Sequence, residues 1–159
     1  MKNQRMLDEL TELMRIDVSS GQETEIAEHL VKKLEQMGFA ITRDEAGATF
    51  GGVCGNILAV REGERDGVVC FCSHMDRVPG GIGIKPVEED GILRSSGDTI
   101  LAADDLSGVA AILEGVRQAI ESGKALPKLE ILFTVGEEAG LYGAKAFDVS
   151  LLTSKTMYV

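Results

Sequence analysis

Three stretches of the chain repeat their apolar side chains at the spacing of an α-helix. The first covers residues 3–16, the second precedes Gly38, and the third precedes Gly123. Apolar residues three and four positions apart fall on one helix face, so each stretch predicts an amphipathic helix. Glycine commonly follows the last turn of such a helix. Ser20, with Glu23 three positions later, resembles a capping box that would begin the second helix.

Between the helices, apolar residues alternate or run together as they do in β-strands. Strands are predicted at 39–43, 56–60, 68–73, 129–135 and 156–159. The tight turn 64–67 joins the second and third of them. The run 129–135 is almost continuously apolar, as in a central strand covered on both faces. A hairpin-like stretch follows the loop 77–86, and a short helix is predicted at 142–147. This order predicts an α/β fold, a three-layer sandwich with a mixed, mostly parallel sheet.

Composition and charge exclude several classes of protein. The 159 residues are 44% hydrophobic, which suits one globular domain with a core. A net charge of −10 argues against nucleic acid and anionic membrane surfaces as partners. The N-terminus is polar and no apolar run reaches the length of a membrane span, so we expect a cytoplasmic protein without a signal peptide. Much of the acidic excess is predicted on solvated helix faces, at Glu9, Glu12, Glu25, Glu28 and Glu35.

The three cysteines and one of the two histidines carry no clear chemistry. Cys70 and Cys72 are two positions apart on a predicted strand, so their side chains share one side. A pair of thiols without partner histidines makes a poor zinc site. We therefore expect these two and Cys54 to be buried thiols in a reducing cytosol. His29 lies within a predicted helix and is expected on its solvated face.

The segment Ser-His-Met-Asp at 73–76 is the strongest candidate for a functional site. It ends a predicted strand, where residues two apart point to the same side. A metal-bound imidazole usually donates its other N–H to a carboxylate, which fixes the tautomer. His74 can therefore be a metal ligand and Asp76 the group that orients it. For these residues alone, the alternative is a histidine that is simply packed or exposed.

Two acidic pairs follow apolar runs elsewhere in the chain. Asp104-Asp105 begins the third helix, where one carboxylate could cap the helix and the other bind a cation. Glu137-Glu138 follows the central strand, where two carboxylates repel each other unless a cation or a shared proton is present. One glutamate could bind a metal while the other takes a proton from water, as in metal-assisted hydrolysis. The alternative is an exposed acidic turn. Because ligands of open α/β sheets bind beyond the carboxyl ends of strands, we expect these pairs to meet His74.

The glycine-rich segments 51–55 and 80–83 do not predict a nucleotide site. Neither contains the Gly-Lys-Ser/Thr ending of a phosphate loop or the GxGxxG order of a dinucleotide-binding turn.

Three motifs in this order closely resemble a known family. They are Ser-His-Met-Asp-Arg-Val-Pro at 73–79, Asp-Thr-Ile-Leu-Ala-Ala-Asp-Asp-Leu-Ser-Gly-Val-Ala at 98–110, and Thr-Val-Gly-Glu-Glu-Ala-Gly-Leu-Tyr-Gly-Ala-Lys at 134–145. The family is that of the dizinc exopeptidases, which includes peptidase T, carboxypeptidase G and acetylornithine deacetylase. The resemblance covers nearly the whole chain, and the third motif is nearest to peptidase T. Leu106 departs from the family, in which lysine is common at that position.

The resemblance implies a role for each candidate residue. His74 is similar to the histidine ligand of one zinc ion, and Asp76 to the carboxylate that orients it. Asp104 resembles the aspartate that bridges both zinc ions and is often followed by a cis peptide bond. Glu137 matches the general base, and Glu138 the carboxylate ligand of the second zinc. Two Zn²⁺ per full-length subunit and a phosphorylase/hydrolase-like catalytic domain are also implied.

The same resemblance implies an activity and a larger protein. The activity is zinc-dependent hydrolysis of short peptides, of aminopeptidase or tripeptidase type, with deacylation of N-acyl amino acids as the alternative. Family members contain a further acidic ligand, a final histidine, and a separate lid domain that can form a homodimer. We therefore expect residues 1–159 to be the N-terminal portion of the catalytic domain, without the lid. Alone, this portion is expected to be catalytically incompetent, acting at most as a partner-binding module.

Overall fold

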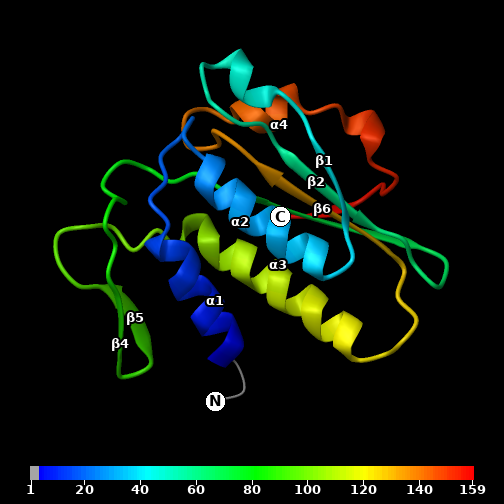
Figure 1. Cartoon of the computed structure of the whole chain (residues 1–159), viewed down its shortest axis with the longest axis horizontal. Coiled ribbons are helices and arrows are strands. Elements are labelled where there is room, and N and C mark those ends of the chain that lie inside the picture. The colour runs from blue at the N-terminus through cyan, green and yellow to red at the C-terminus, as the bar shows by residue number, and fades with distance from the viewer. Residues whose placement is uncertain (1–3) are drawn as a thin grey trace.

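The computed structural model describes residues 4–159 and has a five-stranded sheet at its centre (Figure 1). The strand order is β1-β2-β6-β3-β7. The strands are β1 (Ala40–Arg43), β2 (Ile57–Arg61), β3 (Val68–His74), β6 (Lys128–Thr134) and β7 (Met157–Tyr158). The pairs β1·β2 and β2·β6 are antiparallel, whereas β6·β3 and β3·β7 are parallel. The predicted mixed α/β sheet is confirmed.

Three amphipathic helices cover one face of the sheet (Figure 1). They are α1 (Gln4–Arg15), α2 (Thr24–Gln36) and α3 (Ala103–Glu121), close to the predicted ranges. Residue 3, the first of the predicted helix 3–16, lies outside the described residues. The main core joins the helices to the sheet through Leu13, Met14, Ile26, Leu30, Val109, Leu113, Ile131 and Phe133.

The opposite face has a thinner cover, which completes the three layers. It comprises the 3-10 turns η1 (Ala46–Thr49) and η2 (Val149–Leu151) and the short helix α4 (Tyr142–Ala146). A small apolar cluster lies beneath it, formed by Leu58, Leu132 and Phe147. Strand β6 is thus buried on both faces, as its apolar run predicts.

Strand order is the point on which local sequence patterns were least informative. Strands β2 and β3 follow each other in the chain through the turn at 64–67, but β6 lies between them in the sheet. The predicted hairpin-like stretch forms β4 (Pro86–Glu89) and β5 (Ile92–Ser95), which within residues 4–159 pair only with each other. Among residues 4–159, no helix combines the length and the apolar character needed to cross a bilayer.

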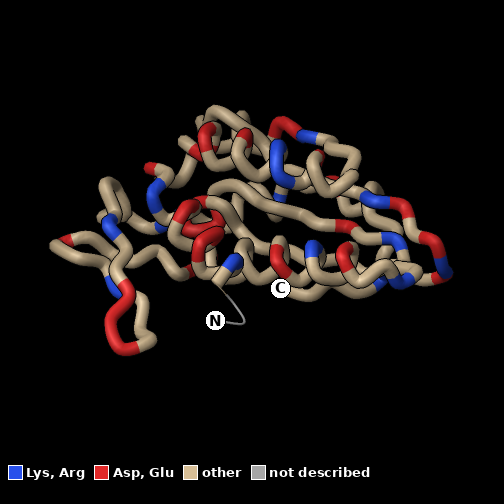
Figure 2. Tube along the Cα trace, turned by 60° about the horizontal axis from the view of Figure 1, so that its bottom comes forward, with Lys and Arg blue, Asp and Glu red and all other residues tan. Residues whose placement is uncertain are grey.

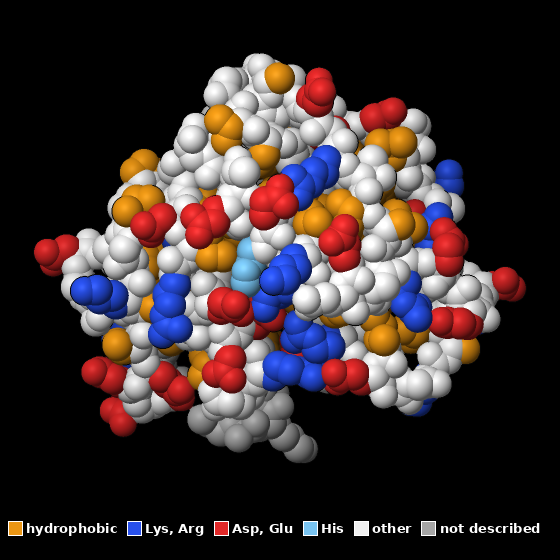
Figure 3. Space-filling view, in the orientation of Figure 1, with side chains coloured by type: hydrophobic (Ala, Val, Ile, Leu, Met, Phe, Trp, Pro, Cys, Tyr) orange, Lys and Arg blue, Asp and Glu red, His pale blue; other side chains and the backbone are white. Residues whose placement is uncertain are grey.

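Acidic residues occur in many parts of the described trace, with basic residues interspersed among them (Figure 2). Acidic and basic side chains are also intermingled on the face formed by α1, α2 and α3 (Figure 3). Glu9 was predicted to lie on a solvated helix face, and this prediction is wrong, because its side chain is only 4% exposed. It accepts a hydrogen bond from Arg117 of α3 at 3.1 Å and lies 2.8 Å from the Lys33 ammonium of α2.

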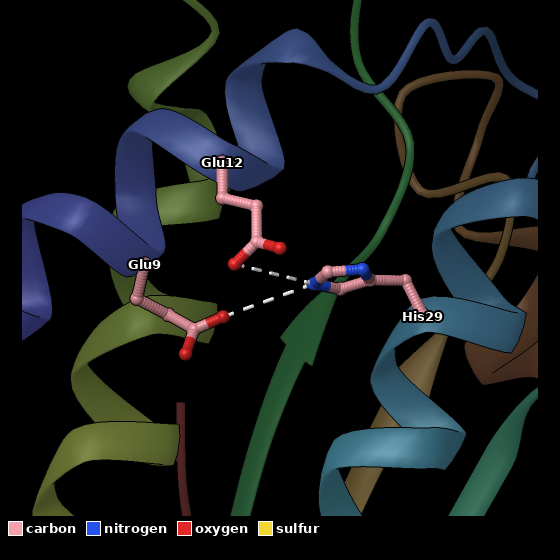
Figure 4. Close-up of side chains that lie close together, drawn as sticks. All are labelled: Glu9, Glu12 and His29. Carbon is pink, nitrogen blue, oxygen red and sulfur yellow. Dashed lines mark ion pairs between the residues drawn. The ribbon is translucent and has the colours of Figure 1, made fainter.

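His29 is also less exposed than predicted. Its ring points from α2 towards Glu9 and Glu12 of α1 (Figure 4), with Nε2 3.9 Å from a carboxylate oxygen of each. The Lys33 ammonium lies 2.8 Å from those same two oxygens, so the space where a metal ion would bind is already occupied by a cation. This cluster is therefore an ion-pair network between helices.

The cysteines are unpaired, but only one of them is fully buried. Cys70 is inaccessible, whereas Cys54 and Cys72 are partly exposed, which corrects the prediction for those two. Burial raises the pKa of Cys54 and Cys72 to about 11 and that of Cys70 to about 12, so all three are thiols at neutral pH.

Candidate metal centre

The predicted site residues lie at one rim of the sheet because β3 and β6 end together. The two parallel strands are in register with His74 opposite Thr134, and the amide of Met75 extends the pairing with a 2.9 Å bond to the Thr134 carbonyl. The structure brings one ligand atom each of His74, Asp104 and Glu138 within 4.8 Å of one another. Their roles as metal ligands stay a prediction.

The imidazole of His74 lies between two aspartates. Its Nε2 is 3.2 Å from Oδ1 of Asp104, and its Nδ1 is 3.0 Å from the backbone carbonyl and 3.5 Å from the carboxylate of Asp76. Burial lowers the pKa of His74, but the two aspartates outweigh it and raise the pKa to about 9. The ring is thus oriented through Nδ1, which leaves Nε2 facing the other candidate ligands.

The two residues of the pair Asp104-Asp105 point to different partners, and Asp105 takes the capping role that the sequence left open. A cis peptide bond joins the two residues, and both have non-helical backbone angles, so α3 is regular only after Asp105. Asp105 acts as the cap, since its Oδ1 accepts the Gly108 amide at 3.1 Å and its Oδ2 accepts the Ser73 hydroxyl at 2.7 Å. Asp104 instead turns towards His74, with 85% of its side chain exposed.

Asp76 connects His74 to the glutamate turn. It is fully buried, and its two oxygens accept the backbone amides of Glu137 at 2.9 Å and Glu138 at 3.1 Å. The hydroxyl of Ser20 donates to the same carboxylate. Burial raises the pKa of Asp76, but His74, Ser20 and the Glu137 amide outweigh it and lower the pKa. Asp76 therefore remains ionised and fixes two site segments at once.

The carboxylates around Glu138 make the rim suitable for a cation. Burial raises the pKa of Glu138, and the negative charges of Glu137, Asp104 and Asp76 add to the increase, against the opposing effect of His74. Such crowding is relieved when a positive ion binds. A histidine nitrogen and carboxylate oxygens are also the donors that zinc prefers in hydrolases. The donor set and its spacing therefore fit a divalent metal.

Sequence reasoning missed the residues that support this rim. The predicted capping box is wrong: Ser20 donates to Asp76, while Glu23 accepts the amides of Gly21 and Gly136. Asn56 accepts the Val135 amide at 3.1 Å. Ser73, which donates to Asp105, is a fourth supporting residue. Of the four, it alone stands within a motif that the sequence marked as functional, since it directly precedes His74. The others act from distant parts of the chain.

A large hollow lies away from these ligand candidates. It is an apolar groove of about 740 Å³ between α3 and the β3–β7 edge, and it includes Phe71, Ile112 and Tyr158. Asp105 borders the groove, but His74 and Glu138 do not line it. The candidate metal centre is open to solvent on the side of Asp104, whose side chain is 85% exposed.

Comparisons with known proteins identify the group to which this fold belongs. The chain matches Peptidase family M28 over residues 56–158, more than half of its length. It is 37% identical over 159 residues to the uncharacterized protein YqjE of Bacillus subtilis (strain 168), covering 99% of this chain and 43% of that protein.

Two solved structures are similar over nearly the whole chain. Aminopeptidase PepT from Bacillus cereus ATCC 10987 has a TM-score of 0.94 and 39% identity. A tripeptidase from Staphylococcus aureus subsp. aureus Mu50 has a TM-score of 0.92 and 34% identity. In both comparisons the match covers 98% of this chain and 42% of the other, so the chain spans less than half of their length. The predicted resemblance to peptidase T is confirmed, and the chain belongs to peptidase family M28.

Proposed function

We propose that the protein containing this chain is a zinc-dependent exopeptidase that removes the N-terminal residue of short peptides. The observation that carries the proposal is the approach of His74, Asp104 and Glu138 within 4.8 Å at the rim of the sheet. Similarity to an aminopeptidase and a tripeptidase supports the reaction and the substrate class. A dimer of the longer protein and a cytoplasmic location are parts of the same proposal.

In this proposal the rim residues hold two zinc ions. His74 would bind one, Glu138 the other, and Asp104 both. Bound zinc supplies Lewis acidity, which polarises a peptide carbonyl and lowers the pKa of water. Asp76 keeps the Nδ1 side of His74 engaged, so that Nε2 is free to act as a ligand.

Glu137 is the proposed general base. It is half-buried beside Glu138, and its backbone amide is fixed by Asp76 at 2.9 Å. Its carboxylate would accept a proton from the attacking water and transfer it to the leaving amine. A carboxylate held in place in this way is suited to proton transfer.

The test separates the roles of the two glutamates in the longer protein. Glu137→Gln is expected to reduce tripeptide turnover by about 100-fold or more while zinc content is unchanged, because a base is not a ligand. Glu138→Gln is expected to reduce the zinc content as well, since one ligand is weakened. Metal analysis and a tripeptidase assay measure both effects.

Glu88→Gln on the exposed β4–β5 hairpin is the control and should change neither quantity. Equal zinc loss in the Glu137 and Glu138 variants would contradict the assigned roles. A panel of N-acyl amino acids assayed beside the peptides tests the alternative, deacylation, which breaks the same type of bond.

A further inference from the structure

The turn after β6 offers three consecutive backbone amides to two buried carboxylates. The Glu137 and Glu138 amides donate to Asp76, as described above, and the Gly136 amide donates to Oε1 of Glu23 at 3.0 Å. Gly136 has a φ of +59°, and a Cβ atom there would lie 2.6 Å from the ring of Phe50. The backbone is thus confined at the residue that precedes both site glutamates.

Glu23 is well placed to fix the position of Gly136. It directly precedes α2, whose residues Ile26, Ala27 and Leu30 lie in the main core. Its side chain is inaccessible, and the same Oε1 accepts the Gly21 amide at 2.9 Å. Its Oε2 has no hydrogen-bond partner among residues 4–159. The hydrogen-bonded oxygen therefore joins a rigid helix start to the site turn.

A buried carboxyl group with an unpartnered oxygen is unfavourable for stability. An apolar side chain would fill the same space without this penalty. What an apolar side chain cannot supply is an acceptor for Gly136. The loss of that acceptor would leave Gly136 with an unpaired amide next to Glu137.

We propose that Glu23 is a positioning residue of the metal centre: by fixing Gly136 it sets the distance between the Glu138 carboxylate and His74. This inference rests on the proposed function, because it treats Glu138 as a ligand. Asp76 accepts the amides of Glu137 and Glu138, which follow Gly136, and Glu23 accepts the amide of Gly136 itself. With both in place the turn has one orientation, as a preformed metal site requires.

The experiment titrates zinc chloride into the full 159-residue chain by calorimetry and follows amide hydrogen exchange by NMR. Glu23→Leu removes the acceptor, and we expect zinc affinity to fall roughly 10- to 100-fold, the usual effect of losing support around a ligand. In this variant the Gly136 amide hydrogen should exchange with solvent faster than in the unsubstituted chain. Glu23→Gln retains an acceptor and should restore both properties. Glu23→Asp, which keeps the carboxyl group but shortens the side chain, should resemble Glu23→Leu and covers the case in which the leucine variant does not fold.

Glu130 provides a matched control on β6 itself. It is equally inaccessible and accepts two backbone amides, from Thr153 at 2.9 Å and Ser154 at 3.1 Å. Glu130→Leu should lower the melting temperature but leave zinc affinity and Gly136 exchange unchanged. The proposal is overturned if Glu23→Leu or Glu23→Asp binds zinc as tightly as the unsubstituted chain, or if Glu130→Leu weakens zinc equally.

The exchange measurement separates this inference from the proposed function. If the unsubstituted chain binds no zinc, the proposed function loses its support. Faster exchange of Gly136, with Thr153 and Ser154 still protected in the Glu23→Leu variant, would nevertheless establish that Glu23 positions the turn. Unchanged exchange at Gly136 would reject the positioning role whatever the zinc result.

Discussion

Arg77 brings a positive charge into the interior, and none of the described residues 4–159 places a carboxylate within hydrogen-bonding distance of it. Its side chain is 1% exposed, and its guanidinium donates to the carbonyls of Leu13, Met14 and Ile16 at the end of α1 and to that of Gly81. The last carbonyls of a helix lack partners within the helix and carry its negative dipole end. Arg77, the residue after Asp76, therefore anchors α1 beside the candidate metal centre.

Replacing this arginine should destabilise the fold. Arg77→Met keeps most of the aliphatic volume but leaves several buried carbonyls unpaired, so we expect a loss of roughly 3 kcal/mol in unfolding free energy. Arg77→Lys should recover only part of it, because a lysine cannot reproduce the fork of donors. Urea denaturation measures both. Arg94→Met on the exposed hairpin is the control, with an expected change within about 0.5 kcal/mol. A near-neutral Arg77→Met would show that water replaces the guanidinium.

The candidate ligands were visible in the sequence, whereas most of the residues that support them were not. His74, Asp104 and Glu138 stand at the ends of apolar runs, and their residue types already suggest metal binding. Glu23 and Asn56 act on Gly136 and Val135, more than 70 positions away in the chain. No local pattern distinguishes a buried carboxyl group that bonds a distant amide from an ordinary helix cap.

The helix layer is linked by charge as well as by apolar packing. Glu9 of α1 contacts Lys33 of α2 and Arg117 of α3, and Arg5 of α1 bonds Glu114 of α3 at 2.7 Å. Burial raises the pKa of Glu9, but His29, Lys33 and Arg117 outweigh it and lower the pKa from 4.5 to about 2. Glu9 is therefore charged in the folded state down to a lower pH than in the unfolded chain.

The stability supplied by Glu9 should depend on pH in a defined window. Its folded pKa is depressed, so the contribution is fully present above about pH 4.5 and is lost as pH falls towards 2. Above that window, Glu9→Gln should lower the free energy of unfolding by on the order of 3 kcal/mol. Urea denaturation from pH 7 to pH 2 should show the difference between the two proteins shrinking. Glu88→Gln is the control. A difference that is constant with pH would contradict the ionised pairing.

Element types were predictable because each helix and strand shows its own periodicity. Their order in the sheet was not, because β2 and β3 are neighbours in the chain through a tight turn and nothing local signals that β6 separates them. The pairing of β6 with both strands is decided by burial. Its nearly continuous apolar run can be covered on both faces only in the interior of the sheet.

At the scale of the whole molecule, the candidate metal centre is open on one side. Asp104 is 85% exposed, and the apolar groove beside α3 leaves Tyr158 60% exposed at the sheet edge. The described residues thus supply candidate ligands but no enclosure for a peptide. Exclusion of water and enclosure of substrate are what lids contribute to hydrolases.

The 159-residue chain alone is therefore expected to hydrolyse no peptide at a useful rate. It should bind zinc weakly through His74, Asp104 and Glu138, because water would complete the coordination. Incubation with zinc and a tripeptide panel, followed by chromatography, measures turnover, and aminopeptidase PepT from Bacillus cereus is the positive control. Turnover near that of the control enzyme, abolished by Glu137→Gln, would show that these residues form a complete site.

The central position of β6 also has a consequence for synthesis on the ribosome. Both β2 and β3 emerge before residue 128, and a short turn joins them, so the nearest available partner for each is the other. Local contacts form faster than distant ones. A nascent chain that pairs β2 with β3 directly must separate them again before β6 can enter. We therefore expect a direct β2–β3 hairpin to compete with the native pairing during synthesis, and a pause in translation before Lys128 would prolong that competition.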